Sequence, residues 1–81
     1  MIESITPCIK VKIINGMIRC DRYIDEGEKI KFITENDKII EGKFLFIELS
    51  QYYECDDILH IESNSGKILT YGVSEIKQFM D

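Results

Sequence analysis

The chain has 81 residues, of which 44% are hydrophobic and 31% charged, and its formal net charge is −5. This composition excludes a disordered or collagen-like chain and predicts one folded domain over residues 1–81. The longest uncharged apolar run covers only residues 44–47, and the first residues lack the apolar core of a signal peptide. We therefore expect a cytoplasmic protein.

The residue types also limit the secondary structure and the redox chemistry. Isoleucine occurs 16 times while alanine, the best helix former, is absent, so strands are favoured over helices. Cys8, Cys20 and Cys55 form no CxxC pair, and an odd number argues against a secreted disulfide scaffold, so we expect reduced thiols. A zinc site of these thiols with His60 is the alternative, but the spacing of known zinc motifs is missing. We predict no metal and no cofactor.

Two alternating segments, residues 8–14 and 17–23, flank the dipeptide Asn15-Gly16. Apolar residues alternate with lysines in the first segment, as expected for a strand with one wet face. Asn-Gly between two such runs is a strong hairpin signal, because a type I′ turn needs positive φ at both central positions. The sequence therefore predicts an N-terminal β-hairpin over residues 8–23.

Four later segments also have strand patterns, and they cover residues 29–34, 39–49, 58–62 and 67–73. In the first of them, Ile30, Phe32 and Thr34 share one face. The second has apolar residues on both faces, which indicates one bent strand with Gly42 or a bulge at the bend. An amphipathic helix is the alternative there, but the glycine and the β-branched residues count against it.

Short strands joined by tight turns predict an all-β protein. Ser74 is expected to cap one helical turn, after which Ile76 and Phe79 return to the core. Closing the strands into a barrel would remove exposed edges. We therefore predict a small closed barrel of five to six antiparallel strands over residues 27–81, preceded by the hairpin of residues 8–23.

Residues 27–80 resemble the SH3-like small barrels and, within them, the Sm-like group. The shared features are Gly42 in the long strand, an Ile-x-Ile hairpin followed by Gly66-Lys67, and a closing Val-Ser-Glu-Ile-Lys-Gln-Phe segment. The chain is also similar to the Rho-inhibiting Rof family of Sm-like proteins, through its acidity, its length and the segment Ile5-Thr6-Pro7-Cys8. A hairpin is predicted after Cys8, where that family has an acidic helical segment, so the resemblance assigns no site residue here.

The polar loop of residues 50–57 is the partner-binding surface that we predict. Exposed aromatic residues in loops commonly contact partners. Residues 25–81 hold six lysines and thirteen acids, and this net charge of −7 suits a basic partner surface. A calcium or magnesium site is the alternative for the acids, but no EF-hand spacing supports it. The predicted contact residues are Tyr52, Tyr53, Glu54, Asp56 and Asp57.

A second candidate contact lies on the hairpin. Its basic residues are predicted to share the outer face, where like charges repel unless they meet an anion or an acidic partner. Solubility and protection of the strand edge explain them nearly as well. These residues are Lys10, Lys12, Arg19 and Arg22. His60 is expected to be an exposed strand histidine beside acids, with Glu62 on its face, and not a catalytic base.

The sequence contains no phosphate loop, nucleophile elbow or paired metal motif, so we predict that the protein is not an enzyme. The expected function is a regulatory protein–protein interaction by a non-catalytic module. Abundant isoleucine and lysine with only two arginines suit an AT-rich bacterial or phage genome. An RNA-binding Sm-like oligomer is one alternative, with assembly through barrel edges. A structural subunit of a larger complex is the other, and no membrane partner is expected.

Overall fold

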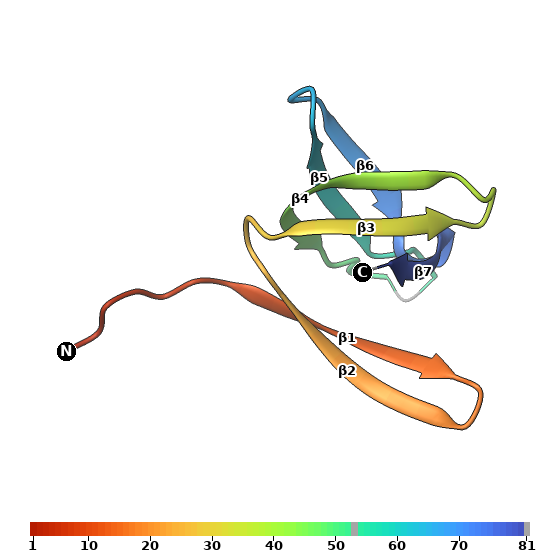
Figure 1. Ribbon diagram of the computed structural model, residues 1–81, viewed down its shortest axis with the longest axis horizontal. Helices are drawn as coiled ribbons and strands as arrows, with labels where there is room; N and C mark the ends of the chain where they lie inside the picture. The colour runs from red at the N-terminus through yellow and green to blue at the C-terminus, as the bar shows by residue number, and fades with distance from the viewer. Residues whose placement is uncertain (53, 81) are drawn as a thin grey trace.

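The computed structural model describes residues 1–52 and 54–80, which form two antiparallel β-sheets (Figure 1). The small sheet is the hairpin of β1 (Cys8–Asn15) and β2 (Ile18–Asp25). The large sheet has five strands in the order β6-β5-β4-β3-β7, and the 3₁₀ turn η1 joins β6 to β7. These elements are β3 (Lys29–Thr34), β4 (Ile39–Glu48), β5 (Ile58–Ser63), β6 (Ile68–Gly72), η1 (Val73–Glu75) and β7 (Ile76–Met80). The predicted all-β class is confirmed, and no helix in the described part of the chain is long and apolar enough to cross a membrane.

The predicted closed barrel is wrong, because the large sheet is open. Within the described residues its edge strands β6 and β7 share no ladder, and the hairpin pairs with neither edge. The chain turns at η1 after β6, and β7 then pairs with β3 at the opposite edge, between Thr34 and Lys31. Side chains alternate in the same way in an open curved sheet and in a closed one, so the sequence pattern could not separate the two.

The N-terminal hairpin is confirmed, but its turn differs from the predicted one. Asn15 pairs with Ile18, so the two-residue loop consists of Gly16 and Met17. Gly16 has a φ of +65°, whereas the φ of Met17 is not positive. A positive φ at the first loop residue alone belongs to a type II′ turn, which matches the twist of the strands as well as type I′ does. Because Asn15 stays in the ladder, β1 ends one residue later than predicted, and β2 begins one residue later. β2 also ends two residues later than predicted.

The core lies between β3 and the strands that curve around it. The buried face predicted for β3 is confirmed, since Ile30 is 2% exposed, Phe32 0% and Thr34 6%. The Phe32 ring meets the rings of Tyr71 on β6 and Phe79 on β7 edge to face, at centroid distances of 5.4 and 5.9 Å. One side chain thus contacts both edges of the sheet. The other buried apolar residues are Ile24, Phe44, Leu59 and Ile61, and Ile76 and Phe79 pack against the core as predicted.

The long strand β4 contains a bulge, which is one of the two devices predicted for its bend. Its pairing with β5 shifts between Phe44 and Phe46, and this shift leaves Leu45 as the extra residue. An extra residue reverses which positions face the core, so apolar residues before and after it can all be buried. The bulge therefore explains the apolar run on both faces, and Gly42 lies elsewhere in the strand.

The predicted cap at Ser74 is wrong. Gly72 takes the N-cap position of η1, and its amide donates a hydrogen bond to the Glu75 carboxylate at 3.2 Å. Ser74 lies inside η1, where its amide and its hydroxyl donate to Asp56. Because Asp56 is 18 residues away in the sequence, the local rules for helix caps could not identify this contact.

Candidate functional site

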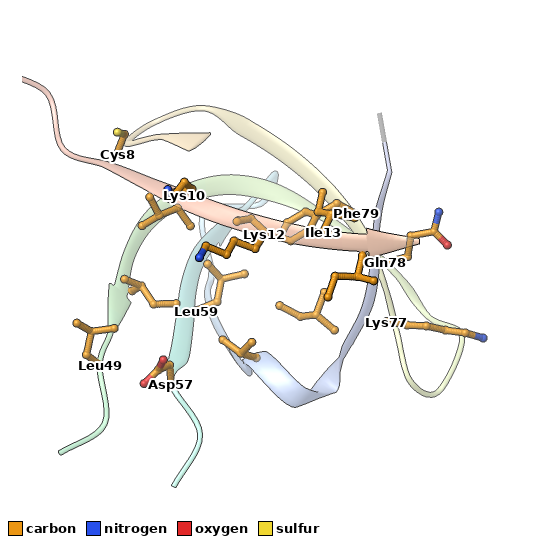
Figure 2. A pocket seen from close by; sticks show the side chains of 16 residues that line it. Cys8, Lys10, Lys12, Ile13, Leu49, Asp57, Leu59, Lys77, Gln78 and Phe79 are labelled. Atoms are coloured by element: carbon orange, nitrogen blue, oxygen red, sulfur yellow. The ribbon is translucent and has the colours of Figure 1, made fainter. Parts of the chain in front are cut away.

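A groove of about 930 Å³ lies between the hairpin and the large sheet, and β1 crosses it in Figure 2. One wall is β1, and the other is formed by the end of β4, the start of β5, η1 and β7. Alternation along β1 points every second side chain toward the sheet, and these inward side chains are apolar. The apolar lining includes Ile9, Val11 and Ile13 on β1 and Leu59, Ile76 and Phe79 on the opposite wall.

Two strands that each have an edge without a strand partner line the groove. Residues 8–14 of β1 and residues 76–79 of β7 contribute to it, whereas no residue of β2 does. β2 covers one edge of β1, and β3 covers one edge of β7. In Figure 2, β1 crosses β7 rather than running beside it. In the described part of the chain, the groove is therefore bordered by two strands with an open edge each, and we call it the strand slot.

Side-chain contacts hold the hairpin beside the sheet. Ile24 of β2, which faces the same side of the hairpin as its partner Ile9, is fully buried. The Arg22 guanidinium lies over the Phe79 ring, 5.5 Å from its centroid, and 3.5 Å from the Glu28 carboxylate. Cation–π contacts of this kind contribute about 0.5–2 kcal/mol. The hairpin is thus positioned without a backbone ladder to the large sheet, which leaves the strand slot open.

The mouth of the strand slot combines exposed apolar side chains with positive charge. Leu49 is 70% exposed and Val73 is 45% exposed, although both line the slot. Large apolar side chains left in water at the edge of an apolar groove are typical of contact surfaces. Lys10 and Lys12 also line the slot and are exposed (Figure 2). The slot therefore offers apolar contact inside and attraction for acids at its mouth.

The structure separates the five residues of the predicted loop surface. Tyr53 lies outside the described residues, whereas Tyr52 is 69% exposed and Glu54 is exposed as well. The carboxylates of Asp56 and Asp57 both accept hydrogen bonds from the chain itself, at 2.5 to 2.8 Å. Asp57 also lines the strand slot. The two aspartates thus fasten the loop to its surroundings, and the sequence pattern alone did not distinguish this role from partner contact.

The Asp56 contact is expected to make stability depend on acid pH. Hydrogen bonds from the Ser74 hydroxyl and then from the Ser74 amide hold the pKa of Asp56 below its ordinary value of 3.8. Because the folded-state pKa is depressed, this contribution is fully present above the unfolded-state pKa and is lost as the pH falls through the folded-state pKa. Asp56→Asn should therefore lower the Tm at neutral pH, and its difference from the wild type should shrink below pH 3.8.

Thermal unfolding followed by circular dichroism across this pH range tests the Asp56 contact. Glu54→Gln is the matched control, because it removes an exposed acid of the same loop and should leave the Tm unchanged. The expected linkage would be contradicted if the Tm difference between Asp56→Asn and the wild type stayed constant from neutral pH to about pH 2.5.

The four basic residues of the hairpin do not share one face. Lys10, Lys12 and Arg19 lie on its outer face, where Lys12 is paired across the strands with Asp21. Arg22 lies on the inner face, against the large sheet. The prediction is wrong for Arg22, because residues three apart in one strand point to opposite faces. The outer face therefore mixes both signs of charge and is a weaker anion site than four clustered cations would be.

His60 is less exposed than predicted. Its Nε2 lies 3.0 Å from the Glu48 carboxylate of β4, and its ring stacks on Phe46 with centroids 4.2 Å apart. Its side chain is 17% exposed. The acid beside it thus comes from the neighbouring strand rather than from Glu62 of its own. The bulge in β4 sets that cross-strand register, and the sequence could not place it to the residue.

The cysteines and acids do not assemble a metal site in the described part of the chain. Cys8, Cys20 and Cys55 are exposed free thiols. Among residues 1–52 and 54–80, no three side chains of His, Cys, Asp or Glu gather as metal ligands would. The zinc alternative therefore has no ligand cluster among these residues.

Comparison of the chain with protein-family models, with curated proteins and with solved structures gave no match. The groove is therefore interpreted from its own geometry. Its long walls are strand edges, its lining is apolar, and its mouth carries lysines. These properties suit an extended peptide segment, which supplies backbone hydrogen bonds along its whole length and side chains that alternate between two faces.

Proposed function

We propose that this chain is a non-catalytic, SH3-like module with an open sheet that binds an extended protein segment in the strand slot. The observation that carries the proposal is an apolar groove lined by residues 8–14 of β1, a strand whose outer edge has no partner in the described part of the chain. An added strand would pair with that open edge and place alternate side chains against the groove, which is binding by strand addition.

The strand connectivity supports the SH3-like part of the proposal. The last strand, β7, pairs with β3, the first strand of the large sheet, and only the three-residue turn η1 separates it from β6. Phe32 contacts rings on both edge strands, so the sheet curves far enough to enclose a core. A curved sheet that stays open leaves unpaired edges, and exposed edges of this kind are templates for another chain.

The chemistry of the slot defines the segment that fits it. Ile9, Val11 and Ile13 are half-buried, and they would contact alternate apolar side chains of an added strand. Lys10 and Lys12 point to the opposite face of β1, where acids between those apolar residues would meet them. The expected ligand is therefore an extended segment in which apolar and acidic residues alternate.

Selection of random heptapeptides on the intact chain tests the proposed function. The selected peptides should alternate apolar and acidic residues. Leu49→Glu/Val73→Glu places repulsive charge at the mouth and should weaken their binding by about tenfold or more. Ile39→Glu/Ile68→Glu is the matched control, because these exposed isoleucines do not line the slot and should leave the affinity unchanged.

Two results would overturn the proposed function. One is a set of peptides that bind Leu49→Glu/Val73→Glu and Ile39→Glu/Ile68→Glu with equal affinity. The other is an absence of bound peptides together with salt-dependent binding of single-stranded oligoribonucleotides, which would favour an RNA-binding role.

A further inference from the structure

We infer that the strand slot takes residues 1–6 of a second copy of this chain, so that two copies exchange these segments, which we call the arms. The inference rests on the proposed function, because it names the occupant of the same slot. It goes further in stating that the protein regulates access to its own binding site through its concentration.

The arm has the properties of a strand without a neighbour. It extends away from both sheets in Figure 1, and its Ile2 and Ile5 are 74% and 83% exposed. Isoleucine and threonine, which make up half of it, favour strands. Six extended residues span about 20 Å, and the eight residues of β1 span about 26 Å. The arm is thus long enough to cover most of one wall of the slot.

The arm cannot reach the slot of its own molecule without breaking the hairpin. The Pro7 carbonyl accepts a hydrogen bond from the Glu26 amide at 3.0 Å, which continues the pairing of the hairpin past Cys8. This bond directs the arm away from the groove. A reversal at Pro7 would lose the bond and would use at least two of the six residues in a turn. An arm in the slot must therefore come from another molecule.

The charges and side-chain directions of the arm complement the slot. Alternation places Ile2, Ser4 and Thr6 on one face and Glu3 and Ile5 on the other. When Ile2 faces the apolar lining, Glu3 lies on the side of β1 that carries Lys10 and Lys12. Ile2 thus supplies an apolar contact and Glu3 an opposite charge. Net repulsion between two acidic chains is offset locally, because the acid of each arm meets lysines of the other copy.

Exchange of the arms produces a closed dimer. Each copy donates one arm and accepts one, so the interface uses the same surface on both copies and is satisfied by a two-fold axis. The open edge of β1 in each copy then gains a neighbour. Association therefore stops at two copies. If each copy only donated its arm to the next copy, association would continue into an open-ended assembly.

Sedimentation equilibrium of the intact chain over a range of concentrations tests the exchange. The expected result is a monomer–dimer equilibrium, in which Ile2→Glu raises the dissociation constant about tenfold or more. Glu3→Lys should also weaken the dimer, through repulsion from Lys10 and Lys12. Ile68→Glu is the matched control, because it changes an exposed isoleucine outside the slot and should leave the dissociation constant unchanged.

A labelled peptide of residues 1–7 separates this inference from the proposed function. The peptide should bind the Ile2→Glu protein, whose slot is intact and vacated, and should bind the Leu49→Glu/Val73→Glu protein about tenfold less tightly or worse. A protein that stays monomeric at about 1 mM, or an equal effect of Ile2→Glu and Ile68→Glu, would overturn the exchange. If selected heptapeptides still bound in the slot, the proposed function would stand while the arm assignment failed.

Discussion

Phe32→Ala is expected to lower the free energy of unfolding by about 3–5 kcal/mol. The Phe32 side chain is fully buried, and its ring contacts Tyr71 and Phe79 from the two edge strands of the large sheet. Its removal leaves a cavity between side chains of the two edge strands. A domain of this size is stable by only about 4–12 kcal/mol, so the variant should be largely unfolded at moderate temperature. Urea denaturation followed by circular dichroism measures the loss.

Phe46→Ala is the matched control for the core. Phe46 is 52% exposed and stacks on His60 outside the core, so its loss should cost about 1.5 kcal/mol or less. The two variants remove the same side chain from neighbouring strands. Equal losses of stability in both would contradict the position of the core on the Phe32 side of the sheet.

Gly42→Ala is expected to destabilise the protein by about 1–3 kcal/mol. A Cβ at Gly42 would lie 2.7 Å from the backbone oxygen of Glu62 and 3.2 Å from Cδ1 of Ile61. Gly42 is central in the sheet, with Ile30 of β3 on one side and Ser63 of β5 on the other, so the strands would have to separate. This cost exceeds the gain of about 0.4–1 kcal/mol that alanine normally brings by restricting the unfolded chain.

Gly72→Ala distinguishes backbone contact from side-chain contact. A Cβ at Gly72 would meet the Asp56 carboxylate at 2.5 Å, and that side chain can rotate away. The expected result is a smaller loss of stability than for Gly42→Ala, together with a shifted amide resonance of Ser74 as its bond to Asp56 is lost. A Gly42→Ala variant that is as stable as the wild type would show that β4 and β5 can move apart freely.

The local pattern of residues was sufficient for the strands themselves. Alternation identified the hairpin and the buried face of β3 with Phe32, and the apolar run on both faces of residues 39–49 required a bend, which the bulge at Leu45 supplies. These features depend on φ preferences and on a period of two, and both are properties of neighbouring residues. Ile9 and Val11 also showed from the sequence that one face of the hairpin is apolar. This apolar face was the one sequence signal that another part of the chain must pack against the hairpin.

Pairings between distant segments required the folded chain. Three features join residues that are far apart in the sequence: the contact of Asp56 with Ser74, the acid beside His60, and the groove lined by both β1 and β7. Alternation states which side chains share a face, but it does not state which strand lies next to which, because every edge offers the same backbone donors and acceptors. In the folded chain, Phe32 contacts rings on both β6 and β7. One edge of β1 and one edge of β7 have no strand partner in the described residues, and the groove that both strands line is the candidate site.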